Sequence, residues 1–312
     1  MENRAVTKRS SAEFVLSIIT ATYNRGYCLH NLYLSLQRQT CFQFEWIIVD
    51  DGSVDNTKQL VQTWRKEEHS FPICYIQKPN GGKHTAMNVG VSEAKGDFVF
   101  FVDSDDTLTQ DAVEKAVLWC RQIADDACFA GVSGCKADRA GNLLGKFPPD
   151  TDHVDATNIE RYRRHLEGDK AEIYRTALLR EYPFPEFPGE RFLPEGAVWD
   201  EIAHHGYKLR WFHDIIYLCE YQTDGLTQNN LEHIRHSFQG FTLVKKKMYT
   251  YYPFPQNWKA LIAYVETAHR CGLRGTAIKE NMEIGTAAYC TARILCIVKQ
   301  FLLKWKEKHI GK

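Results

Sequence analysis

Residues 98–106 read FVFFVDSDD, an apolar run that ends in three carboxylates. Strands without polar alternation are typical of a parallel sheet that has helices on both faces. Two more such runs lie earlier in the chain, LSIIT at 16–20 and FEWIIVDD at 44–51, and helical apolar patterns separate them. This alternation predicts a three-layer, Rossmann-like α/β fold with a mostly parallel central sheet.

The polar residues after these strands indicate where ligands bind. The carboxyl ends of parallel strands meet at one edge of a sheet, and ligands bind beyond that edge. Asp103 and Asp105 follow the third run at positions i and i+2, where two carboxylates can hold a hard divalent cation. Alternatively, Asp105 or Asp106 caps the helix that follows, and the two interpretations are compatible.

A glycine pair suggests a phosphate site in KPNGGKHTAMN at 78–88. Glycines let the backbone approach a phosphate, and the ammonium of Lys83 could neutralise its charge. Asp51, in VDDGSVDNT at 49–57, could accept hydrogen bonds from a nucleobase or a ribose hydroxyl. Each segment could also be no more than a loop or a tight turn.

Composition limits the classes of function. In 312 residues, 39 Lys and Arg balance 39 Asp and Glu, so the basic excess expected of a nucleic-acid-binding protein is missing. The ten cysteines form no CxxC pair, which favours reduced thiols. The opening residues lack the apolar region of a signal peptide, and Lys299 and Gln300 interrupt the longest C-terminal apolar stretch. We therefore expect a cytoplasmic protein, either soluble or peripheral at the inner face of the membrane.

Three segments together resemble a known family. LSIITATYNR, EWIIVDDGSVDNT and NGGKHTAMNVGVSEAKGDFVFFVDSDD are similar, in order and spacing, to the donor half of inverting family 2 glycosyltransferases with the A-type fold. The resemblance runs from Leu16 to Leu108 and continues more weakly to Gln228. It implies a nucleotide-diphospho-sugar transferase fold over residues 1–228, with a donor half at about 14–108 and an acceptor half at about 109–228. A C-terminal helical region would follow at 229–312.

The resemblance also implies roles for individual residues. Asp103 and Asp105 would be the metal pair that holds Mg²⁺ or Mn²⁺, with Asp106 as a candidate third carboxylate. Tyr23 would lie against the base and Asp51 at its polar edge. The residues that would bind the donor are Thr20, Ala21, Tyr23, Arg25, Asp51, Lys83, Asn88, Asp103 and Ser104.

The family's catalytic base usually lies in a Glu-Asp pair, and RFLPEGAVWDEIA at 191–203 is the corresponding segment here. Gly196 occupies the usual Asp position. Glu195 is therefore the first candidate for the base, with Asp200 and Glu201 as fallbacks. Glu195 could instead be a carboxylate that stabilises a helix N-terminus.

Farther on, Tyr221, Asp224 and Thr227 could form a lid, or an ordinary turn.

The function implied by the resemblance is metal-dependent, inverting transfer of a sugar from a nucleoside diphosphate, most often UDP. The acceptor would be a hydroxyl of a glycan or polyprenol-linked glycan in surface-polysaccharide assembly. A sugar-nucleotide nucleotidyltransferase is the first alternative, but TATYNRGY at 20–27 lacks the glycine-rich basic loop that a triphosphate needs. The second is a non-catalytic sugar-nucleotide-binding protein, which the missing Asp beside Glu195 favours. The C-terminal helix either packs on the catalytic domain or lies on anionic lipid.

Overall fold

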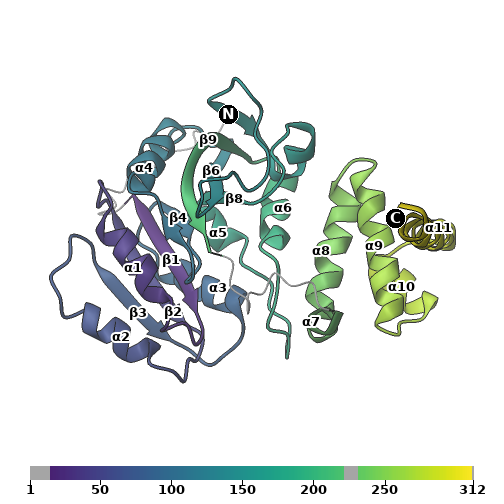
Figure 1. Cartoon of the computed structure of the whole chain (residues 1–312), viewed down its shortest axis with the longest axis horizontal. Coiled ribbons are helices and arrows are strands. Elements are labelled where there is room, and N and C mark those ends of the chain that lie inside the picture. The colour runs from purple at the N-terminus through teal and green to yellow at the C-terminus, as the bar shows by residue number, and fades with distance from the viewer. Residues whose placement is uncertain (1–14, 221–230, 311–312) are drawn as a thin grey trace, which may run out of the picture.

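Nine strands form one sheet in the computed structural model, which describes residues 15–220 and 231–310 (Figure 1). Their order is β3-β2-β1-β4-β8-β6-β9-β5, and β7 pairs with β9. The strands are β1 Leu16–Thr22, β2 Phe44–Asp50, β3 Ile73–Gln77, β4 Phe98–Phe101, β5 Thr107–Leu108, β6 Phe129–Asp138, β7 His153–Ala156, β8 Lys170–Arg175 and β9 Lys208–Cys219.

Strands β1 to β4 are parallel, as their unbroken apolar sequences predict. Beyond β4 the directions mix, because β8 runs antiparallel to β4 and β6, whereas β9 runs parallel to β6. Strands β5 and β7 are antiparallel to β9. The sheet as a whole is therefore mixed, and the expected parallel arrangement describes its first four strands.

Helices cover both faces of the sheet and confirm the three layers. One apolar core joins the sheet to α1, α2 and α4, and a second core joins the opposite face to α3, α5 and α6. These helices are α1 Leu29–Gln37, α2 Thr57–Trp64, α3 Lys83–Glu93, α4 Ala112–Gln122, α5 Thr176–Glu181 and α6 Gly196–His204, and the 3₁₀ helix η1 is Asn158–Arg163.

The C-terminal residues form the expected helical region, which lies beside α6 (Figure 1). Leu261, Tyr264 and Ile278 belong to a third core within this region. The helices are α7 Leu231–His236, α8 Phe238–Tyr251, α9 Gln256–Arg270, α10 Gly275–Met282 and α11 Thr286–Ile310. Within the described residues, none of the helices has both the length and the apolarity to cross a bilayer.

Candidate functional site

The loops that follow β1 and β2 are bonded to one another at the carboxyl edge of the sheet. Asn24, whose φ is 52°, donates its backbone N–H to Ser53 Oγ at 2.8 Å and accepts the N–H of Val54 at 2.9 Å. Tyr23 lies in the first loop with 47 % of its surface exposed. Arg25 is partly exposed and bonds Tyr27. The two loops thus hold Tyr23 and Arg25 at the open side of the site.

Thr20 and Ala21 lie below these loops. The Thr20 hydroxyl is buried and accepts a hydrogen bond from Trp46 Nε1 at 3.0 Å, so it belongs to the core under the site. Ala21 is half-buried and packs on the opposite core. The Thr20 side chain therefore points into the core, whereas Tyr23 and Arg25 lie in the exposed loop above it.

Asp51 shapes the glycine loop at 80–82. Its Oδ1 accepts the ammonium of Lys78 at 2.7 Å and the N–H of Gly81 at 2.9 Å, and its Oδ2 accepts the N–H of Gly82 at 2.7 Å. Both carboxylate oxygens thus bond the loop from which α3 begins. Contact of Asp51 with a nucleobase stays a prediction.

Gly82 permits a close backbone contact beside α3. Its φ is 97°, and a Cβ at this position would lie 2.0 Å from the carbonyl oxygen of Arg191. Only glycine fits both the backbone conformation and the space. The segment that leads to α6 can therefore pass directly over the start of α3, where Lys83 is located.

Lys83 joins two of the predicted site residues. Its Nζ lies 2.6 Å from Asp103 Oδ1 and 2.7 Å from Glu195 Oε1. Burial lowers the pKa of Lys83, but the two carboxylates outweigh it and raise this pKa well above its usual value. Burial raises the pKa values of Asp103 and Glu195, and Lys83 outweighs that effect and lowers both. The structure therefore brings together an ionised acid-lysine-acid cluster from three distant segments.

Asp105 and Asp106 lie beside this cluster. Burial and the charge of Asp103 raise the pKa of Asp105. Asp106 is buried and accepts the N–H of Glu220 at 2.8 Å, and burial raises its pKa to about 6. Ser104, between the two acids of the predicted metal pair, is also buried.

The acid pair fits a divalent cation. Asp103 and Asp105 offer hard oxygen donors, and their mutual repulsion is the kind that a cation relieves. Within the described part of the chain, no group of three His, Cys, Asp or Glu side chains could hold a metal ion. A cation held here would therefore need further ligands, as Mg²⁺ commonly finds in substrate phosphates.

Three predicted residues have supporting contacts elsewhere. Asn88 bonds the backbone of Phe184 through both its amide atoms, each at 2.9 Å, and so fixes that loop. Asp200 is 3 % exposed, and its Oδ1 accepts hydrogen bonds from Asn158 at 2.6 Å and Tyr252 at 2.8 Å. Glu201 pairs with Lys247 of α8 at 2.7 Å. None of these contacts involves the Lys83 cluster.

The predicted lid residues Tyr221, Asp224 and Thr227 lie outside the described residues.

Two residues of later strands were missed in the sequence: Tyr217 of β9 contacts Asp103, and Lys136 of β6 interacts with Asp103 electrostatically. The Tyr217 hydroxyl accepts the backbone N–H of Asp103 at 2.9 Å. Lys136 lies opposite Tyr217 in the β6–β9 register, with Nζ 4.1 Å from the Tyr217 ring centroid. Burial lowers the pKa of Lys136, and Asp103 more than offsets this and raises it. In the sequence, Lys136 stands out only as a charged residue directly after the apolar run FAGVSGC, and this pattern does not show which residue it contacts.

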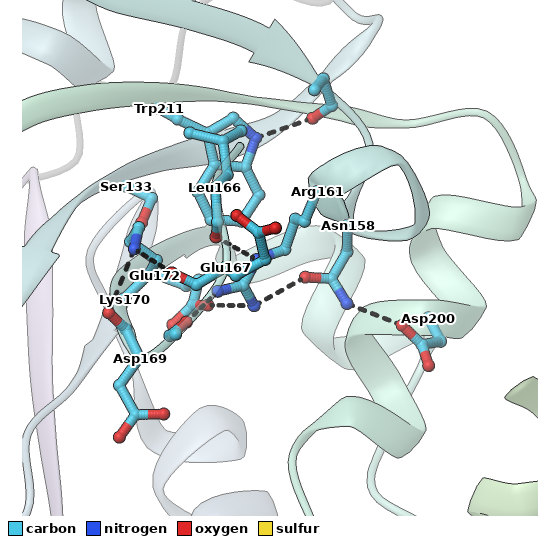
Figure 2. Close-up of polar contacts among 12 residues, drawn as sticks. Ser133, Asn158, Arg161, Leu166, Glu167, Asp169, Lys170, Glu172, Asp200 and Trp211 are labelled. Atoms are coloured by element: carbon cyan, nitrogen blue, oxygen red, sulfur yellow. Dashed lines mark hydrogen bonds and ion pairs between the residues drawn. The ribbon is translucent and has the colours of Figure 1, made fainter. Parts of the chain in front are cut away.

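A polar network joins η1 to β8 and α6 (Figure 2). Arg161 bonds the carbonyl oxygen of Leu166 at 3.2 Å and lies 3.6 Å from a Glu172 oxygen. It also contacts Asn158 at 3.4 Å, and Asn158 in turn bonds Asp200 of α6. The network thus fixes α6, the helix that begins directly after Glu195.

Comparison with known proteins identifies the class. The family model for glycosyl transferase family 2 matches residues 17–182, which is more than half of the chain. The chain therefore belongs to glycosyl transferase family 2. This confirms the family expected from the motifs.

Curated relatives carry glycosyltransferase names. One is the GalNAc(5)-diNAcBac-PP-undecaprenol beta-1,3-glucosyltransferase of Campylobacter jejuni, 29 % identical over 59 % of this chain and 58 % of the relative. Another is the poly(ribitol-phosphate) beta-N-acetylglucosaminyltransferase TarS of Staphylococcus aureus, 31 % identical over 54 % of this chain and 29 % of TarS. The chain thus spans less than two thirds of the length of both relatives.

Solved structures confirm the A-type fold. TarS residues 1–349 in complex with UDP-GlcNAc match with a TM-score of 0.56 at 19 % identity, over 89 % of this chain and 90 % of that one. The mannosyltransferase PcManGT from Pyrobaculum calidifontis, in complex with GDP-Man and Mn²⁺, matches with a TM-score of 0.55 at 16 % identity. That match covers 97 % of this chain and 89 % of PcManGT.

Proposed function

We propose that the protein is a metal-dependent, inverting glycosyltransferase that uses a nucleoside-diphosphate sugar. The observation that carries the proposal is Lys83, which joins a proposed metal ligand to the proposed base. A UDP-sugar is the favoured donor, since TarS structures are described with UDP and with UDP-GlcNAc. The favoured acceptor is a hydroxyl of a glycan or polyprenol-linked glycan in surface-polysaccharide assembly, which the relatives' names support.

The donor site combines several groups. Asp103 and Asp105 hold Mg²⁺ or Mn²⁺, a choice supported by the Mn²⁺ in the PcManGT complex. When bound, the cation supplies positive charge that stabilises the departing diphosphate. Tyr23 and Arg25 contact the nucleoside. Thr20, Ala21, Asp51, Ser104 and Asn88 shape the loops and strand ends around it, and Lys83 donates to the phosphates.

Glu195 is the proposed base. It removes the proton from the acceptor hydroxyl while the hydroxyl oxygen attacks the anomeric carbon, and the diphosphate leaves from the opposite side. Lys83 keeps Glu195 ionised before the donor arrives. When the phosphates draw Lys83 away, Glu195 loses its counter-ion and its pKa rises, which makes it a stronger base. Asp200 is proposed to position α6, because Asn158 and Tyr252 occupy its oxygen.

The cytoplasm is the proposed compartment. The cytoplasm supplies nucleotide sugars, and all ten cysteines of the chain are thiols, as expected under reducing conditions.

The test is calorimetric titration with UDP, GDP, CDP and dTDP, with Mn²⁺ and again with excess chelator. We expect one nucleotide to bind with Mn²⁺ and binding to disappear with chelator. In Glu195→Gln, nucleotide binding should persist while transfer from the matching nucleotide sugar falls by about 10² to 10⁴-fold.

The alternatives give different results. Binding of a nucleotide sugar without any turnover by the unaltered protein would favour the non-catalytic binding protein, for which Gly196 beside Glu195 is the supporting feature. No nucleotide binding by folded protein would contradict the proposal altogether.

A further inference from the structure

Helix α11 has two unlike faces. Ala292 and Cys296 are fully buried in the C-terminal core, and Lys299 pairs with Glu266 of α9 at 3.0 Å. The opposite face carries large apolar side chains at intervals of three and four residues, which places them on one side of a helix. These side chains form the α11 stripe, with exposed fractions of 60 % for Ile294, 55 % for Ile297, 47 % for Val298, 70 % for Phe301 and 53 % for Leu302.

The stripe differs from the other exposed apolar residues of the described chain. Val54, Leu118 and Phe254 are also exposed, but they lie far apart in the sequence, and single apolar residues are normal on a protein surface. A contiguous apolar stripe is different, because such patches mark contacts with a partner or a membrane. We therefore expect the α11 stripe to be covered by a binding partner or a membrane.

The charge of helix α11 indicates what the stripe binds. Helix α11 spans 25 residues, and apart from Lys299, which pairs with Glu266, its sequence contains four Lys and Arg but one Glu. An apolar stripe on a helix rich in basic residues matches the interface of an anionic bilayer, where apolar groups enter the acyl boundary and basic groups meet the headgroups. A second copy of the chain would bring the same excess of positive charge to the contact, which opposes self-association.

We propose that the α11 stripe binds an anionic lipid surface and holds the protein on a membrane as a peripheral protein. Figure 1 shows α11 beyond α9, on the side away from the sheet. Lipid binding itself does not depend on the transferase reaction. Delivery of a polyprenol-linked acceptor to the candidate site does rest on the proposed function.

A series of packed helices connects α11 to Glu195. Helix α11 packs on α9, α9 on α8, and α8 on α6, whose N-cap is Glu195. In the last of these contacts, Lys247 of α8 donates to the carbonyl oxygen of Ala197 at 2.8 Å. A protein bound through α11 would therefore hold the Lys83 cluster at a fixed orientation to the lipid surface.

The experiment is vesicle flotation of the full chain. We expect flotation with phosphatidylglycerol vesicles and much less with phosphatidylcholine vesicles. In the double variant Ile294→Glu, Phe301→Glu, the fraction bound to phosphatidylglycerol should fall by roughly tenfold or more, because two apolar groups are replaced by anionic ones. Leu118→Glu, at a site on α4 that is 52 % exposed, is the matched control and should float like the unaltered chain.

Several results would overturn the proposal. They are absence of flotation with either vesicle, equal flotation with both vesicles, and unchanged flotation of the double variant. Sedimentation without lipid gives a further check: a dimer that the double variant abolishes, without vesicle binding, would assign the stripe to a second copy. Because nucleotide titration of the same variants reports on the donor site separately, failure here and failure of the proposed function are distinguishable.

Discussion

Lys83 holds together two carboxylates that would otherwise repel one another. With its Nζ within 2.7 Å of both Asp103 and Glu195, it occupies an oxygen that the proposed metal would share. Lysine and cation therefore compete for Asp103. The same ammonium is expected to become a phosphate ligand once the donor is present.

This competition predicts opposite effects in Lys83→Met. Affinity for Mn²⁺ alone should rise, because Asp103 loses its counter-ion, whereas affinity for UDP with Mn²⁺ should fall by about 10 to 100-fold through loss of a charge-assisted hydrogen bond. Calorimetry of both titrations measures the two effects. Lys115→Met on α4, which removes ion pairs with Asp111 and Asp214, is the control and should change neither. A parallel loss of both affinities would argue against the competition.

Gly82 offers a second prediction at the scale of a residue. Gly82→Ala should lower the free energy of unfolding by about 1–3 kcal/mol, because the new Cβ meets Arg191 and the backbone has a left-handed conformation. Gly141→Ala is a matched control, since its φ is 85° but nothing lies within 4 Å. Urea unfolding should show the larger loss for Gly82→Ala, together with weaker UDP binding. Equal losses would mean that contact with Arg191 is unimportant.

At the scale of the element, α6 connects the proposed base to the rest of the molecule. Glu195 is its N-cap residue, and Asp200 and Glu201 bond η1 and α8 from the interior of the helix. Burial raises the pKa of Asp200, although Tyr252 and Asn158 partly offset this. A buried carboxyl group with a raised pKa contributes more to the stability of the fold when it is protonated than when it is ionised.

Asp200→Asn tests this assignment. Asparagine can still accept hydrogen bonds from Asn158 and Tyr252, but it carries no charge to bury. Because the folded-state pKa of Asp200 is raised, its contribution to the free energy of unfolding is present at low pH and is lost as pH rises through that pKa. The unaltered protein therefore loses this contribution at higher pH, whereas the variant has no such contribution to lose. Thermal unfolding at pH 5 and pH 8 should show the variant gaining relative stability at the higher pH. Transfer activity should persist, and its loss would return Asp200 to the list of candidate bases.

At the scale of the whole molecule, the donor half was predictable and the acceptor half was not. Strands β1 to β4 are apolar runs separated by helices, so local pattern and chain order define their parallel pairing. Strand β6 instead pairs with β8 and β9, which lie far along the chain and carry no local signal of direction. The motifs likewise located Lys83, Asp103 and Glu195, but not the orientation of Thr20 or the partners of Asp51, which depend on tertiary contacts.

The contact between Tyr217 and Asp103 limits how this protein can be divided. The hydroxyl that fixes the backbone at Asp103 comes from β9, and Lys83 of the donor half pairs with Glu195 of the acceptor half. The two halves therefore do not behave as interchangeable modules. A chimera that joined residues 1–108 to the later part of another chain would keep a working site only if the incoming part supplied equivalents of both Tyr217 and Glu195.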